Sequence, residues 1–213
     1  MIKCSTSLWS ADLTNLAAEV RRVDPYSERF HLDVADGHYV PTLLFFPDLV
    51  KALRPVTATP FEVHLMCDDP LAWIGPFVEA GADGVIFCYD SLADVAAAVG
   101  AAKHAGAFVG ISLQVHESLE VLNDVWPDLD LVTIVGTPMG VKGASMEAAI
   151  PEKIRRARSL ILENGWKAEV QVDGGIRRGS VPLLKAAGAD WIVPGSLMFG
   201  EEPAAMREWL AAV

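Results

Sequence analysis

Two strand-like segments and one strand end carry histidine and aspartate side chains that suit metal binding. His31 and Asp33 lie two residues apart in a short apolar run, so they project from the same face of a strand. His64 lies in a second such run, and Asp173 directly follows a third. Imidazole nitrogens and carboxylate oxygens together suit Zn²⁺, Fe²⁺, Mn²⁺ or Co²⁺. We therefore expect one divalent metal ion at these four residues, provided that the fold brings them together.

Two carboxylates beside one metal ion indicate proton transfer. A metal ion that holds the carbonyl and hydroxyl oxygens of a ketose stabilises an enediolate as the adjacent carbon loses its proton. One aspartate then removes the proton from one face, and the other returns a proton to the opposite face. We expect Asp33 and Asp173 to form this catalytic acid/base pair.

Strand-like and helix-like segments alternate along the whole chain. The expected strands are Ile2–Leu8, Phe30–Val34, Phe61–Met66, Gly84–Tyr89, Phe108–Leu113, Leu129–Val135, Ala168–Val172 and Trp191–Val193. The expected helices are Asp12–Val23, Pro47–Arg54, Pro70–Ala80, Leu92–Ala105, Leu119–Trp126, Met146–Glu163, Val181–Ala187 and Pro203–Ala211. Such alternation requires parallel strands joined by right-handed crossovers.

Eight such units favour an α/β fold of the closed (β/α)8 TIM-barrel type, with residues 1–213 as a single domain. An open doubly wound sheet is the alternative. It is weakened because no GxGxxG turn follows the first strand. In a barrel of this type the active site lies at the C-terminal ends of the strands, where the four candidate ligands are expected.

Glycines after the last two strands indicate a phosphate site. Gly174 and Gly175 follow the seventh strand, and Gly195 and Ser196 follow the eighth. Loops at these positions commonly bind phosphate through backbone amides, and glycine lets the backbone approach the anion closely. The loop 140–143 could close over a substrate, with Lys142 either contacting phosphate or lying in solvent.

Composition narrows the classes of partner. The net charge of −11 and the lack of a basic patch make nucleic acid an unexpected partner, and no apolar run is long enough to span a membrane. The cysteines, Cys4, Cys67 and Cys88, are odd in number and lack CxxC spacing, which argues against disulfides and a zinc–thiolate site. We expect a cytoplasmic protein with reduced thiols.

Five motifs carry a resemblance to a known family. They are Ser7–Asp12, His31–Pro41, Val63–Met66, Val172–Ile176 and Gly195–Ser196. Through them the chain resembles the ribulose-phosphate 3-epimerase family of (β/α)8 barrels over nearly its whole length. The resemblance implies a divalent metal ion on His31, Asp33, His64 and Asp173, of which the two aspartates are the acid/base pair. The substrate-binding positions that we expect are Ser7, His31, His64, Gly143, Asp173, Gly174, Gly175, Gly195 and Ser196.

The chain departs from the family pattern in loops that contact substrate. Ala35 stands where the family usually has methionine, and Thr42 stands where it has asparagine. Cys88-Tyr89-Asp90 replaces the common His-x-Glu, and the segments 114–117 and 135–144 also differ. The reaction is therefore better defined than the sugar.

These observations leave three functions to compare. The first is 3-epimerisation of a ketose phosphate of the ribulose 5-phosphate/xylulose 5-phosphate type. The second is the same chemistry on a tetrulose or hexulose phosphate, and the third is a sugar-phosphate-binding barrel without catalysis. Apolar residues in the segment Leu43–Phe46, together with the family resemblance, also predict a homo-oligomer.

Overall fold

The computed structural model describes residues 1–213, which form a closed barrel of parallel strands. Each strand pairs with the next, and β1 also pairs with β8, which closes the barrel. The strands are β1 (Lys3–Ser7), β2 (Arg29–Ala35), β3 (Phe61–Met66), β4 (Gly84–Cys88), β5 (Phe108–Gln114), β6 (Leu131–Val135), β7 (Glu169–Asp173) and β8 (Trp191–Val193). The predicted (β/α)8 TIM barrel is confirmed.

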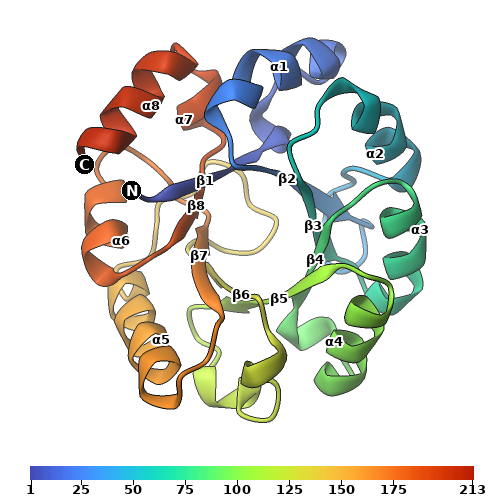
Figure 1. The fold of residues 1–213 in the computed structure, drawn as a ribbon, viewed down its shortest axis with the longest axis vertical. Helices are drawn as coiled ribbons and strands as arrows, with labels where there is room; N and C mark the ends of the chain where they lie inside the picture. Colours follow the sequence, from blue (N-terminus) through green and yellow to red (C-terminus); the bar gives the residue numbers. More distant parts are fainter.

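Helices surround the strands on the outside of the barrel (Figure 1). They are α1 (Leu16–Val23), α2 (Pro47–Leu53), α3 (Ile74–Glu79), α4 (Val95–His104), α5 (Ile150–Asn164), α6 (Val181–Ala187), α7 (Ser196–Phe199) and α8 (Pro203–Ala212). In α5 the buried residues Ile150, Ile154, Ala157 and Ile161 recur on one helical face. This face packs against the sheet.

The connection between β5 and β6 differs from the expected helix at Leu119–Trp126. Two short 3₁₀ turns, Leu119–Leu122 and Trp126–Asp128, take its place. Pro127 lies in the first turn of the second of these, where its missing backbone N–H costs no hydrogen bond, so it favours a new turn that begins at Trp126. Trp126 is instead fully buried and stacks on Trp166, with ring centroids 5.2 Å apart. This aromatic pair covers the sheet where a helix is missing.

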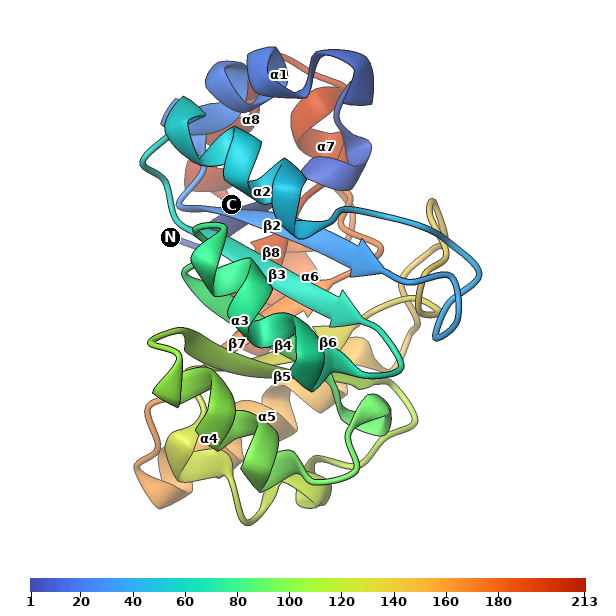
Figure 2. The same cartoon turned by 90° about the vertical axis from the view of Figure 1, so that its right-hand side faces the viewer.

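The helix after β6 also begins later than expected, at Ile150 rather than Met146. Pro151 occupies its first turn, where the missing backbone N–H costs no hydrogen bond. The residues between β6 and α5 therefore form a longer loop than the sequence analysis predicted. Figure 2 shows this loop and the loop after β2 projecting beyond the same end of the barrel, toward which the arrowheads of β2 and β3 point.

Strand alternation divides the side chains between two environments. Phe30, Leu32 and Val34 of β2 belong to the hydrophobic core between sheet and helices, whereas His31 and Asp33 point into the barrel. Barrel interiors are usually filled by branched aliphatic residues. Here the buried polar residues include Ser5, Ser7, His31, Asp33, Glu62, His64, Ser112, Thr133 and Gln171. An interior of this polarity is unusual and points to function.

At the N-terminal end the barrel is filled by stacked side chains. The Arg29 guanidinium lies 4.0 Å from the centre of the Trp191 ring and 4.2 Å from the centre of the Phe108 ring. A Cβ atom on Gly84 would lie 2.1 Å from the Phe108 ring, so this glycine makes room for the aromatic side chain.

The helices of this fold were also compared with the length and hydropathy that a membrane span requires, and none of them meets both.

The contact between Gly84 and Phe108 yields a stability prediction. We expect Gly84→Ala to lower the free energy of unfolding by about 1–3 kcal/mol, because the added methyl group overpacks the barrel. The same substitution in a Phe108→Ala background is expected to cost much less. Urea unfolding of the four proteins measures this coupling.

Gly100→Ala is the matched control. Gly100 lies in α4 and its Cβ would meet nothing within 4 Å, so alanine is expected to add about 0.5–1 kcal/mol of helix stability. Equal costs of Gly84→Ala with and without Phe108 would contradict the packing account.

Candidate functional site

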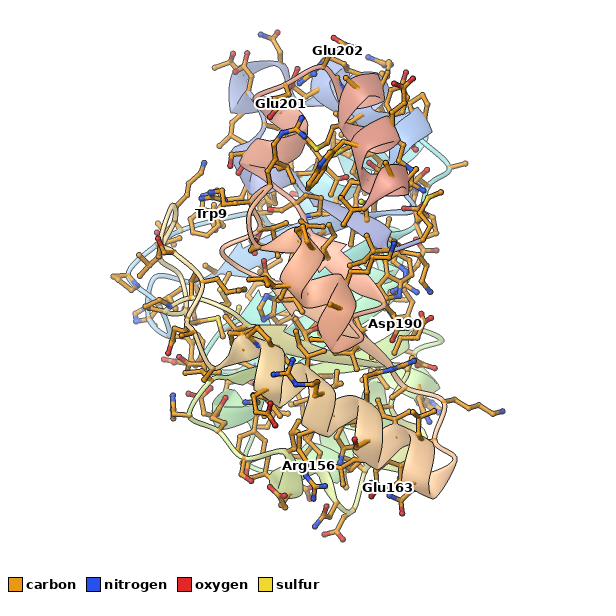
Figure 3. All side chains as sticks on the ribbon, turned by 90° about the vertical axis from the view of Figure 1, so that its left-hand side faces the viewer. Trp9, Arg156, Glu163, Asp190, Glu201 and Glu202 are labelled. Atoms are coloured by element: carbon orange, nitrogen blue, oxygen red, sulfur yellow. The ribbon has the colours of Figure 1, made fainter.

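A cavity of about 290 Å³ opens at the C-terminal end of the barrel. Its walls come from the ends of β1, β2, β6, β7 and β8 and from the loops that follow them. Asp33 and Asp173 both reach this cavity. Trp9, which also lines it, lies beside the projecting loops at this end of the molecule (Figure 3). The predicted location of the site therefore coincides with a cavity in the fold.

The four predicted metal ligands converge beneath this cavity. His31, Asp33, His64 and Asp173 each offer one ligand atom, and these atoms all lie within 4.8 Å of one another. His31 Nε2 lies 3.5 Å from Asp33 Oδ1 and 3.9 Å from Asp173 Oδ2, while His64 Nδ1 lies 3.7 Å from Asp173 Oδ2. Ligands about 2.0–2.2 Å from one tetrahedral ion are about 3.3–3.6 Å apart, which is close to this spacing.

Two buried nitrogen atoms of this cluster have no hydrogen-bond partner: His31 Nε2 and His64 Nδ1. Buried polar atoms are normally hydrogen-bonded, so each orphan requires an explanation. Both atoms face the carboxylates of the cluster. A bound divalent cation would use both lone pairs, and the residues present therefore fit such an ion.

The other ring nitrogen of each histidine is hydrogen-bonded to a residue inside the barrel. His31 Nδ1 lies 2.8 Å from Glu62 Oε1, and His64 Nε2 lies 2.9 Å from Ser112 Oγ. The Ser112 hydroxyl donates to the carbonyl oxygen of Phe87, so it accepts a hydrogen bond from His64 Nε2–H. In the neutral ring that metal binding requires, the Nδ1 lone pair of His64 therefore faces the cluster of ligands. Partners of this kind commonly orient metal-binding histidines.

The site attracts positive charge. Burial alone would lower the pKa of His31, but the neighbouring Asp33 and Glu62 carboxylates raise it well above its usual value. Burial is likewise outweighed at His64, where Cys88 and Asp173 raise the pKa to about 10. Burial opposes ionisation of Asp33, yet the His31 ring lowers its pKa. In this environment a divalent cation would compete with protons for the imidazole nitrogens.

The two aspartates approach the cavity from different sides. β2 and β7 are separated by β1 and β8 in the closed barrel, so Asp33 and Asp173 come to the cluster from strands that are not neighbours. The histidine side chains are 0% and 1% exposed, whereas that of Asp173 is 20% exposed. Ser7 lines the same cavity, and its hydroxyl donates to Asp33 Oδ2 over 2.8 Å. The carboxylates therefore face the space that the histidines do not reach.

The predicted phosphate-binding residues line the same cavity as the two aspartates. They are Gly143, Gly174, Gly175, Gly195 and Ser196. Gly174 and Gly175 have φ values of +88° and +71°, which L side chains rarely adopt. A Cβ atom on Gly175 would also lie 2.6 Å from the backbone nitrogen of Met146. Glycine is therefore required where the loops after β6 and β7 meet.

Lys142 and Arg177 place positive charge at the cavity rim. Lys142 Nζ donates to the Trp9 carbonyl oxygen over 2.8 Å, which joins the loop after β6 to the loop after β1. Arg177 was not predicted from the sequence, although it directly follows the glycine-rich segment. Both side chains are therefore near any anion bound at the glycines.

Other residues of the interior were missed in the sequence analysis, notably Ser5, Glu62, Ser112 and Gln171. Three of these stand two positions before a predicted site residue: Ser5 before Ser7, Glu62 before His64, and Gln171 before Asp173. Side chains two residues apart share a strand face, so this period could have identified them. Ser112 has no such neighbour and is placed only by the pairing of β4 with β5.

Comparisons with known proteins identify the family of the chain. The sequence model of the ribulose-phosphate 3 epimerase family matches residues 3–199. Ribulose-phosphate 3-epimerase from Bacillus subtilis is 34% identical over 203 residues, covering 94% of this chain and 94% of its own. The enzyme of the same name from Treponema pallidum is 36% identical over 194 residues, covering 91% and 89%.

Solved structures at lower identity support the fold alone. A crystal structure of 3-hexulose-6-phosphate synthase has a TM-score of 0.71 at 19% identity, with 99% of each chain covered. Orotidine 5'-phosphate decarboxylase from Pyrococcus horikoshii has a TM-score of 0.68 at 17% identity, covering 97% of this chain and 96% of its own. By its sequence this chain belongs to the ribulose-phosphate 3-epimerase family, and it is an isomerase, an epimerase that acts on carbohydrates.

Proposed function

We propose that this enzyme epimerises a ketose phosphate at carbon 3, with ribulose 5-phosphate and xylulose 5-phosphate as the leading substrate pair. One observation carries the proposal: two carboxylates from separated strands enter one cavity above two unpartnered imidazole nitrogens. We choose a pentulose phosphate as the substrate because the similar proteins are named ribulose-phosphate 3-epimerase. The glycines on the cavity wall support binding of its phosphate.

Asp33 and Asp173 are proposed to transfer the proton. One carboxylate removes the proton from carbon 3, and the electron pair of the broken C–H bond passes into an enediolate. The other carboxyl group then protonates carbon 3 from the opposite face, which inverts its configuration. In the reverse reaction the two groups exchange roles. Ser7 holds one oxygen of Asp33 by hydrogen bonding and so restricts its orientation.

His31, Asp33, His64 and Asp173 are the residues proposed to hold a divalent metal ion. Zn²⁺, Fe²⁺, Mn²⁺ and Co²⁺ all suit this mixture of nitrogen and oxygen ligands. When bound, such an ion supplies Lewis-acid stabilisation of the negative charge of the enediolate. The two histidines are proposed to act only as metal ligands. They are buried beneath the cavity, and the ring nitrogens that point away from the ligand cluster, His31 Nδ1 and His64 Nε2, are already hydrogen-bonded.

The sugar phosphate is proposed to lie between the aspartates and the glycines. Backbone amides near Gly143, Gly175 and Gly195 are available to bind the phosphate without a deeply buried cation. This matters in a protein of net charge −11, which repels an anion at long range. Arg177 supplies a local positive charge beside these amides.

Self-association and a cytoplasmic location stay predictions. Leu43 is 80% exposed and Phe46 is 57% exposed on the loop after β2, which is consistent with a contact between copies of the chain. The same loop borders a second, mostly apolar cavity of about 340 Å³.

Replacing either aspartate tests the proton-transfer roles. We expect Asp33→Asn or Asp173→Asn to reduce kcat by about 10²- to 10⁴-fold, because the amide cannot accept the proton. Asp128→Asn is the control, since Asp128 is exposed and paired with Lys103 away from the cavity. Steady-state kinetics and circular dichroism measure turnover and folding. A folded variant with full activity would remove that aspartate from the mechanism.

A panel of ketose phosphates in D₂O tests the substrate. We expect deuterium to enter carbon 3 of ribulose 5-phosphate and xylulose 5-phosphate, because proton exchange with solvent accompanies epimerisation. Nuclear magnetic resonance or mass spectrometry detects the exchange. Faster exchange into a tetrulose or hexulose phosphate would favour the alternative substrate, to which the altered loops at Ala35, Thr42 and Lys142 also point. Exchange into none of them would contradict the proposed reaction.

Arg177 and its neighbour Arg178 allow a matched test of phosphate binding. We expect Arg177→Ala to raise KM by up to about fivefold with kcat unchanged, as for loss of an exposed charge contact. Arg178 pairs with Glu201 instead and does not line the cavity, so Arg178→Ala is expected to leave KM unchanged. Initial rates at low and high salt measure both. Equal effects of the two substitutions would contradict a specific contact.

A further inference from the structure

Glu62 is a fully buried carboxylate in the interior of the barrel. It lies on β3 two residues before His64, on the same face of the strand. A buried carboxylate is costly unless it is paired and hydrogen-bonded. The function proposed above gives Glu62 no role, so its position requires an explanation.

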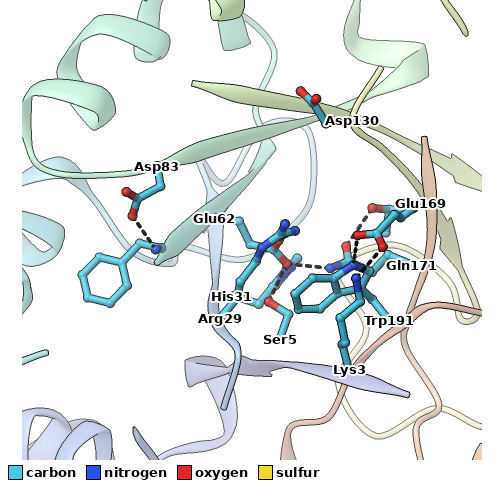
Figure 4. Close-up of polar contacts among 12 residues, drawn as sticks. Lys3, Ser5, Arg29, His31, Glu62, Asp83, Asp130, Glu169, Gln171 and Trp191 are labelled. Atoms are coloured by element: carbon cyan, nitrogen blue, oxygen red, sulfur yellow. Dashed lines mark hydrogen bonds and ion pairs between the residues drawn. The ribbon is translucent and has the colours of Figure 1, made fainter. Parts of the chain in front are cut away.

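Every polar neighbour of Glu62 presents a hydrogen-bond donor. Oε1 lies 2.6 Å from Ser5 Oγ, 2.8 Å from His31 Nδ1 and 2.7 Å from Gln171 Nε2 (Figure 4). The Thr133 hydroxyl donates to Gln171 Oε1, which fixes the amide so that its NH₂ group faces Glu62. Arg29 Nη1 adds a cationic donor beside Glu62 Oε2. Because donors surround both of its oxygens, Glu62 acts as an acceptor.

As an acceptor, Glu62 determines which nitrogen of a neutral His31 ring carries the proton. Because Glu62 accepts from Nδ1–H, the neutral ring that metal binding requires has its Nε2 lone pair facing Asp33 and Asp173. His64 differs, since its Nε2 atom contacts no carboxylate and instead lies 2.9 Å from the Ser112 hydroxyl and 3.5 Å from Cys88 Sγ. A carboxylate partner increases the basicity of an imidazole ligand more than a neutral partner does. The two histidines are therefore unequal ligands.

The charge of Glu62 is balanced from the N-terminal end of the barrel. Arg29 Nη1 lies 3.3 Å from Glu62 Oε2, and the Arg29 side chain is 19% exposed. Arg29 is held by stacking on Trp191 and Phe108. A divalent cation with Asp33 and Asp173 would be neutral, and Glu62 with Arg29 is also neutral. The interior therefore tolerates a third carboxylate close to the site.

We propose that Glu62 is a positioning residue for metal binding: it holds His31 in the Nδ1–H form and strengthens Nε2 as a ligand, with Arg29 as its counter-charge. This inference rests on the metal site of the proposed function. Glu62 itself does not line the cavity and is not proposed to touch the substrate.

Titration of the metal-free protein with Co²⁺ tests this role, with visible absorption as the readout. We expect Glu62→Gln to raise the Kd for Co²⁺ by about 10- to 100-fold, the range found for such partners of metal ligands. Glu169→Gln is the matched control. Glu169 also extends from a strand of the barrel but bonds to Lys3 and Trp191 rather than to His31, so its removal is expected to leave the Kd unchanged.

The results separate the two proposals. Unchanged affinity in folded Glu62→Gln, or equal weakening by both substitutions, would overturn the role of Glu62 while leaving the metal site intact. A wild-type protein that binds no Co²⁺ would overturn the site itself, and with it this inference.

A second measurement needs no variant. In the Zn²⁺-loaded wild-type protein, nitrogen-15 resonance of the histidines is expected to show a hydrogen-bonded proton on His31 Nδ1. A proton on Nε2, or none on either nitrogen, would overturn the proposal even if Glu62→Gln does not fold.

Discussion

Closure of the strands into a barrel is the constraint on which the site depends. In a closed barrel of parallel strands every second side chain enters an interior that excludes water, and each polar group there must find a partner among the other strands. Ser5, Glu62 and Gln171 satisfy one another and His31 in this way. Two imidazole nitrogens of the interior, His31 Nε2 and His64 Nδ1, have no hydrogen-bond partner and lie together below the cavity. The proposed metal site is therefore where the interior leaves these nitrogens unsatisfied.

The same geometry separates the tasks of the four ligands. Glu62 and Ser112 hold the histidines, which do not reach the cavity, whereas Asp33 and Asp173 line it from the separate strands β2 and β7. Groups on opposite sides of a bound sugar are what inversion at one carbon requires. The glycines after β6, β7 and β8 leave room for an anion at a fixed distance from these carboxylates. The end of β7 therefore serves both proposed tasks, because Asp173 is followed directly by Gly174 and Gly175.

The sequence was sufficient to predict the barrel, the strand positions and the convergence of the four ligands, because these follow from hydrophobic alternation and from motifs at strand ends. β3, β8 and α6 have the expected bounds. The 3₁₀ turns around Leu119 and Trp126 were not predicted, because apolar spacing suggested a helix while Pro127 and the buried Trp126 opposed it. The partners of the histidines were also missed. Hydrogen bonds between strands distant in sequence, such as Glu62 to Gln171, depend on register, which the sequence does not display.

The central claim is that one divalent ion binds to two histidines and two aspartates at the end of the barrel. The most direct measurement is a crystal structure of the metal-loaded protein, with anomalous scattering recorded at the absorption edge of the metal. The account predicts a single strong anomalous peak within bonding distance of His31 Nε2, His64 Nδ1 and carboxylate oxygens of Asp33 and Asp173. A peak elsewhere, or stoichiometric metal without contact to both histidines, would contradict it.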